Sequence, residues 1–157
     1  MSKKKWKFGA IGIVVVGAAV LVYNMMRPSG PAFIDPADQT LVMQGKAIYA
    51  NNCATCHGAS LQGQANWRER MPNGKLPAPP HDKSGHTWHH PDPMLIDMVK
   101  NGLVPGKTAP AGYVSDMPAY SAILSDDEII AVLAYIKSAW PAKVLQAQKE
   151  VTFRQQD

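Results

Sequence analysis

The five residues Cys53-Ala54-Thr55-Cys56-His57 decide how this 157-residue chain is interpreted. The two cysteines of the sequence both lie in this stretch, with two residues between them, and a histidine follows the second directly. A redox-active cysteine pair belongs in a strand-helix-strand unit, and no such pattern precedes Cys53. A zinc site would need two more good ligands close by. Both alternatives are therefore disfavoured.

The spacing C-x-x-C-H is the attachment signature of c-type haem. Each thiol can add to one vinyl group of the porphyrin to make a thioether, and the adjacent imidazole can then bind the iron from the proximal side. The sequence therefore predicts one covalently attached haem c. Its thioethers are expected at Cys53 and Cys56, and one axial iron ligand at His57.

Helical patterns flank this motif on both sides. Upstream, Asp35 and Pro36 have the residue types of an N-cap and a first helical position. Downstream, Ser125 and Glu128 have the spacing of a capping box, and Pro141 follows the pattern. The positions at helical spacing are Leu41, Gly45, Ile48 and Tyr49 in the first segment and Ile129, Leu133, Ile136 and Trp140 in the second.

The chain resembles the monohaem bacterial cytochromes c of the mitochondrial-like class (class I), over about residues 33–140. In that family a glycine and an aromatic residue stand eight and four positions before the first haem cysteine, as Gly45 and Tyr49 do here. The resemblance implies that they cross the last helix at Val132 and Tyr135, within V-L-A-Y-I-K. It implies an all-α domain of about three to five helices wrapped around one haem.

The resemblance also implies a methionine as second axial ligand, roughly sixty residues after the proximal histidine. Met117, in S-D-M-P-A-Y, stands at that distance from His57. Met71 is the rival, because a proline follows it too, but only fourteen residues separate it from His57. That is a short path to the opposite face of a haem. We expect Met117 to be the ligand, with Met71, a histidine or an open site as alternatives.

In the same family a loop proline carbonyl receives the other ring proton of the proximal histidine, which orients the imidazole. The segment L-P-A-P-P-H, residues 76–81, offers Pro77, Pro79 and Pro80, and the sequence does not choose among them. A short helix is expected between Asp92-Pro93 and Asn101-Gly102.

The other four histidines all fall in H-D-K-S-G-H-T-W-H-H, residues 81–90. We interpret this segment as a polar loop at the haem rim in which Trp88 packs. A copper or zinc site is the alternative. The residues concerned are His81, His86, His89 and His90.

An uncharged run of 19 residues, Phe8 to Met26, precedes the domain. As a helix it would span about 28 Å, close to the thickness of a bilayer's hydrocarbon core. Four lysines precede it within residues 3–7, which predicts a cytoplasmic N-terminus and a haem domain on the periplasmic side of the bacterial inner membrane. A cleaved signal peptide is the alternative. The predicted organisation is an anchor (1–27), a linker (28–36), a cytochrome c domain (37–141) and a C-terminal tail (142–157).

The charge balance of the chain and the predicted iron ligands exclude several classes of function. Residues 28–157 carry 11 Lys and Arg against 12 Asp and Glu, without a basic stripe, which argues against nucleic acid as a partner. Iron with His and Met on both faces has no open position, so substrate chemistry on the metal is disfavoured. We expect a non-catalytic, membrane-anchored carrier of single electrons between respiratory complexes, with redox proteins as its partners. An accessory haem subunit of a dehydrogenase or oxidase is the alternative, and a haem peroxidase or gas sensor ranks below it.

Overall fold

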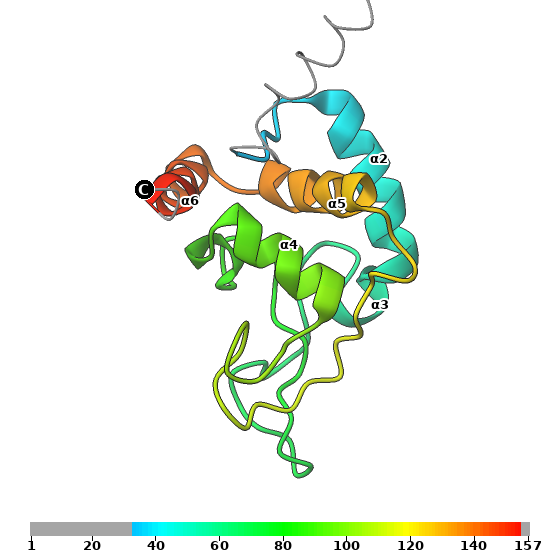
Figure 1. Ribbon diagram of the computed structural model, residues 1–157, viewed down its shortest axis with the longest axis vertical. Coiled ribbons are helices and arrows are strands. Elements are labelled where there is room, and N and C mark those ends of the chain that lie inside the picture. The colour runs from blue at the N-terminus through cyan, green and yellow to red at the C-terminus, as the bar shows by residue number, and fades with distance from the viewer. Residues whose placement is uncertain (1–32, 155–157) are drawn as a thin grey trace, which may run out of the picture. The chain divides into compact units, whose positions relative to one another are not determined.

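The computed structural model describes residues 33–154, which form helices joined by long loops and contain no β-strand (Figure 1). This is the mostly helical domain that the sequence predicts. The elements are α2 (Gln39–Asn52), α3 (Ala54–His57), the 3₁₀ turn η1 (Thr87–His89), α4 (Asp92–Asn101), α5 (Asp126–Ser138) and α6 (Ala142–Arg154).

Helix α2 begins three residues later than predicted. Asp38 is its N-cap, because its Oδ1 accepts hydrogen bonds from the backbone N–H of Thr40 at 3.0 Å and of Leu41 at 3.1 Å. Asp35, the predicted cap, instead accepts from the N–H of Ala37 at 2.9 Å. The prediction was wrong because Asp35 closes a local turn, which competes with helix initiation at the same residue.

Helix α5 begins as predicted. The Ser125 hydroxyl accepts from the N–H of Glu128 at 3.3 Å, and the Glu128 carboxylate accepts from the N–H of Ser125 at 2.8 Å. This reciprocal capping box satisfies two backbone donors that the first helical turn leaves free. The face behind it is apolar and fully buried, at Ile129, Val132, Leu133 and Ile136.

Helices α2 and α5 cross, as the resemblance implies (Figure 1), and Gly45 lies at their closest approach. A Cβ at Gly45 would lie 1.8 Å from the carbonyl oxygen of Ala131, so only glycine allows this approach of the two backbones. One turn further along, the rings of Tyr49 and Tyr135 lie 5.3 Å apart. The predicted partners are thus confirmed, with Ala131 as the closest point.

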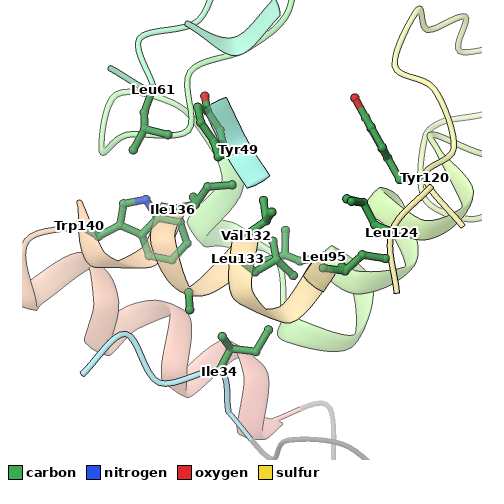
Figure 2. Close-up of a cluster of buried hydrophobic side chains, with 12 residues drawn as sticks. Ile34, Tyr49, Leu61, Leu95, Tyr120, Leu124, Val132, Leu133, Ile136 and Trp140 are labelled. Atoms are coloured by element: carbon green, nitrogen blue, oxygen red, sulfur yellow. The ribbon is translucent and has the colours of Figure 1, made fainter. Parts of the chain in front are cut away.

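The core joins these two helices to α4 and to the loops, as Figure 2 shows. Leu95 from α4 and Leu61 from the loop after α3 lie in the same cluster as Val132 and Leu133. Tyr49 and Tyr120 extend from opposite sides of this cluster, and their hydroxyls point the same way in Figure 2. The helices therefore meet around a small apolar centre that the loops complete.

The segment predicted as a tail, residues 142–157, contains the separate helix α6. The Pro141 carbonyl accepts from the N–H groups of Val144 and Leu145 at 2.9 and 3.0 Å, which starts the helix directly after α5. Helix α6 packs against η1. It is therefore part of the domain, which the sequence left undecided.

The predicted membrane segment, residues 8–26, lies outside the described residues. Within 33–154, none of the helices combines the length and the apolar character needed to cross a bilayer. Ile34 is 1% exposed, and its backbone N–H donates to Asp92 Oδ2 at 2.7 Å. The packing of the domain therefore includes Ile34.

Candidate haem attachment site

The C-x-x-C-H motif occupies the junction between α2 and α3. The N–H of Cys53 donates to the Tyr49 carbonyl at 2.9 Å, and the N–H of His57 donates to the Cys53 carbonyl at 2.9 Å. Gly58 ends the turn with φ = 79°, a conformation that glycine adopts without strain. The thiols and the imidazole are therefore carried on nearly continuous helix, with fixed relative positions.

The two thiols are free and chemically suited to thioether formation. Cys53 is half-buried and Cys56 is exposed, and no disulfide joins them. Burial, with a smaller effect of Cys56, raises the pKa of the Cys53 thiol to about 11. Cys53 therefore keeps its proton at neutral pH, and a protonated thiol is the form that can add across a vinyl group.

His57 has the environment of a metal ligand. It is 8% exposed, and its Nδ1 lies 2.9 Å from the carbonyl oxygen of Pro79. Since a carbonyl only accepts, Nδ1 carries the proton and Nε2 keeps its lone pair. Burial lowers the pKa of His57, although the Pro79 bond opposes this, so the neutral imidazole is favoured. Among the three candidate prolines, the structure selects Pro79.

A second imidazole lies against the first, and sequence reasoning missed this contact. The rings of His57 and His81 are stacked, with centroids 4.0 Å apart and planes 25° apart. His81 Nδ1 lies 2.9 Å from the Thr87 hydroxyl, and burial lowers the pKa of His81 well below its ordinary value. The sequence position of His81, two residues after Pro79, could have suggested that it lies near His57.

The segment carrying Met117 is tied to the end of α2. The Tyr120 hydroxyl donates to the Asn52 carbonyl at 2.7 Å, and the Tyr120 N–H donates to the Val99 carbonyl at 3.1 Å. Met117, three residues earlier, is half-buried. The first bond joins Tyr120 to the residue next to Cys53, and the second joins it to α4. The rival Met71 lies in a turn of its own, where its N–H donates to the Lys75 carbonyl at 2.9 Å.

Two of the remaining histidines pack against other rings. His86 stacks on Trp67 with centroids 5.6 Å apart, and His90 meets His86 edge-on at 5.6 Å. Within residues 33–154, no three His, Cys, Asp or Glu side chains gather in a way that could hold a metal ion. The ring contacts of His86 and His90 fit a polar loop at the haem rim.

The residues present fit a haem. Trp88, in the same loop, has a buried Nε1–H without a hydrogen-bond partner in the described part of the chain. A buried donor normally has a partner, and a haem propionate is an acceptor of the right kind. With two free thiols and a neutral imidazole whose Nε2 is available, the donor set matches covalent haem.

Comparison with known proteins agrees with this chemistry. The family model described as cytochrome c matches residues 42–140. A protein of Corynebacterium diphtheriae named cytochrome bc1 complex cytochrome c subunit is 37% identical over 54 residues, which are 34% of this chain and 19% of that protein. The chain thus spans about a fifth of that relative's length. No solved structure matches.

In c-type cytochromes the covalently bound haem c transfers electrons, and the Cys53 and Cys56 pair fits the attachment motif of that cofactor. This role is not catalytic. The matched residues contain the motif, the crossing of α2 and α5, and the Met117 segment. The chain belongs to the cytochrome c family.

Proposed function

We propose that this chain is a membrane-anchored cytochrome that carries single electrons between respiratory complexes on the periplasmic side. In this proposal Cys53 and Cys56 hold the haem, and His57 and Met117 bind its iron. The bound haem supplies one-electron exchange between ferric and ferrous iron through the porphyrin edge. Ligation on both faces excludes oxygen and peroxide from the metal.

The observation that carries this proposal is the fixed imidazole of His57. Its Nδ1–H is held by Pro79 and its ring is packed against His81, so the Nε2 direction is set before any ligand binds. A carrier benefits from this rigidity, because little reorganisation then accompanies the change of iron charge. The membrane location is supported by the uncharged run from Phe8 to Met26 and the lysines that precede it.

The axial ligands are tested by the visible spectrum of the oxidised protein. The far-red band from methionine sulfur to ferric iron should be present in the wild type and absent in Met117→Ala, whose reduction potential should fall. Met71→Ala is the matched control and should keep both the band and the potential. A band that survives in Met117→Ala would move the ligand role to another residue.

The membrane location and the flow of electrons need a separate test. Cell fractionation should place the haem protein in the membrane fraction, and removal of residues 1–27 behind a cleavable export signal should release it as a soluble haem protein. Intact spheroplasts should expose the haem domain to added protease. If the haem domain were protected from protease under those conditions, the proposed orientation in the membrane would be wrong.

A second candidate function is an accessory haem subunit of a membrane oxidoreductase. It is favoured by the name of the similar protein, a subunit of a cytochrome bc1 complex. Gentle solubilisation separates the two candidates, since a subunit should copurify with its complex in fixed stoichiometry and a carrier should not. Rapid carbon monoxide binding by the reduced protein would contradict both, because it requires an open iron position.

A further inference from the structure

Helix α6 lies beyond the residues that match the family model, yet two of its polar side chains are completely buried. Gln148 and Thr152 are both 0% exposed and stand one turn apart on the same face. A buried polar side chain normally serves hydrogen bonds that cannot be made otherwise. They bond to each other, with Gln148 Nε2 donating to Thr152 Oγ1 at 3.0 Å, and their other partners belong to residues 90–92, the end of the histidine-rich loop.

Gln148 binds both the backbone and a side chain of that loop. Its Nε2 lies 3.1 Å from the His90 carbonyl oxygen and 2.7 Å from Asp92 Oδ1. The amide nitrogen must face these two acceptors, which fixes the orientation of the side chain. Thr152 adds a third contact, because its hydroxyl oxygen accepts from the Asp92 N–H at 3.2 Å. Helix α6 thus holds the loop at two consecutive turns.

A buried ion pair holds the same aspartate. Lys137 Nζ of α5 lies 2.7 and 2.9 Å from the two carboxylate oxygens of Asp92, and both side chains are fully buried. Charges in a low-dielectric interior are stable only when paired and hydrogen-bonded, so Asp92 has little freedom to move. The loop therefore ends at a fixed point.

The other end of the loop lies against the proximal imidazole. His81 stacks on His57, while its carbonyl oxygen accepts from Trp140 Nε1 at 2.8 Å. Between the two ends, η1 packs against α6. The loop is thus held at Asp92 by α5 and α6 and at His81, where it meets His57, by Trp140 directly after α5.

We propose that Gln148 is a positioning residue for the haem iron. By holding His90 and Asp92, it keeps the loop against His57, which fixes the plane of that imidazole and keeps water away from the proximal side. Lower water access raises the reduction potential, because the extra charge of ferric iron is poorly stabilised in a dry site. This inference rests on the proposed role of His57 as an iron ligand.

The test uses the full-length holoprotein with Gln148→Leu, which keeps similar volume and removes the N–H donors. We expect a lower reduction potential, shifted hyperfine resonances of the proximal imidazole, and faster amide exchange in residues 87–90. The methionine band should remain, because the side-chain hydrogen bonds of Gln148 go to His90, Asp92 and Thr152 and not to the Met117 segment. Thr152→Val should change the same quantities in the same direction by a smaller amount.

Gln146→Ala is the matched control on the same helix. Gln146 is exposed and its side chain donates only to Glu150, so its loss should leave potential and resonances unchanged. The inference is overturned if Gln148→Leu keeps the wild-type potential and resonances, even with faster exchange in residues 87–90. If that variant does not fold, Thr152→Val decides by the same two measurements.

Failure of the proposed function has a different signature. It would appear in the wild type itself, as a spectrum without a low-spin histidine-ligated iron. If the wild type has the expected spectrum and Gln148→Leu keeps the wild-type potential and resonances, the proposed electron carrier still stands. Only the proposed role of α6 is then wrong.

Discussion

Two contacts of opposite kinds, one in each half of α5, hold this helix in the domain. In the first half, the backbone at Ala131 lies directly against Gly45 of α2, and the contact consists of close apolar packing. In the second half, Lys137 forms a buried ion pair with Asp92, which also binds Gln148 of α6. The first contact depends on the absence of a side chain, and the second depends on the exact matching of several polar ones. They should therefore fail in different ways.

The largest effect is expected at the apolar half. Gly45→Val places a branched side chain where even a Cβ would lie 1.8 Å from the Ala131 carbonyl oxygen. The helices must separate, and we expect a loss of more than about 4 kcal/mol in unfolding free energy, the range of severe core disruption. The holoprotein should fail to accumulate, as measured by haem staining of exported protein.

Lys46→Val is the control for that variant, because it introduces the same side chain one position further along α2 at an exposed site. It should accumulate normally and lose only about 0.5 kcal/mol from helix propensity. Equal behaviour of the two variants would mean that the close approach of α2 and α5 is dispensable.

The polar half is tested by Lys137→Met. This change leaves the Asp92 carboxylate buried without its counter-ion and should cost about 3 to 5 kcal/mol. Denaturant unfolding followed by circular dichroism measures the loss. Lys100→Met is the control, since Lys100 pairs with Asp126 at the surface at 2.6 Å and should lose at most about 1 kcal/mol.

The double variant Asp92→Asn with Lys137→Met sharpens the result. It removes both charges and keeps an acceptor for the Ile34 N–H, so it should be more stable than Lys137→Met alone. A double variant whose loss equals the sum of the two single losses would show that the pair contributes no coupling.

The same contrast explains how much could be predicted from the sequence. The capping box at Ser125 is local, because Ser125 and Glu128 contain all the atoms that form it. The crossing of α2 and α5 joins residues far apart in the sequence, and it was predicted from the family resemblance that Gly45 and Tyr49 carry by their positions before Cys53. Both predictions were confirmed.

The polar network could not be predicted in this way. Gln148 and Asp92 are 56 residues apart, and in sequence Gln148 looks like any polar residue of an exposed helix. The choice of Pro79 among neighbouring prolines likewise depends on the path of the loop, which residue types do not determine. Asp35 and Asp38 are both capable caps, and the turn at Ala37 decides between them. The roles of His57 and Met117 as iron ligands stay predictions.

A smaller effect is expected where the Met117 segment is attached to α2. Tyr120→Phe removes the hydrogen bond to the Asn52 carbonyl and should cost about 1 kcal/mol. The methionine ligand should then be displaced more readily, measured as faster binding of added imidazole to the oxidised protein. Tyr113→Phe lies in the same loop and should change neither quantity. If imidazole bound to Tyr120→Phe at the wild-type rate, the Tyr120 hydrogen bond would have no effect on how firmly the methionine is bound.

The smallest effect is expected at the start of α5, where the pH dependence has a definite sign. Ser125→Ala removes the cap and should cost about 1 kcal/mol at neutral pH. Hydrogen bonds from the backbone and hydroxyl of Ser125 lower the pKa of Glu128 in the folded protein. The pKa of this carboxyl is near 4.5 in the unfolded chain and lower in the fold. The ionised carboxylate therefore stabilises the fold when the pH is above 4.5, and this contribution disappears as the pH falls through the pKa of the folded protein.

Glu128→Gln should therefore be less stable than the wild type at pH 7, and the difference should shrink as the pH falls below the unfolded value of 4.5. Thermal unfolding of both proteins at several pH values measures it. Asp127→Asn is the control, because Asp127 is also acidic and in the first turn but forms no part of the capping box. A constant difference between Glu128→Gln and the wild type across this range would mean that the charge of Glu128 does not contribute to the cap, and that its oxygen serves only as a neutral acceptor.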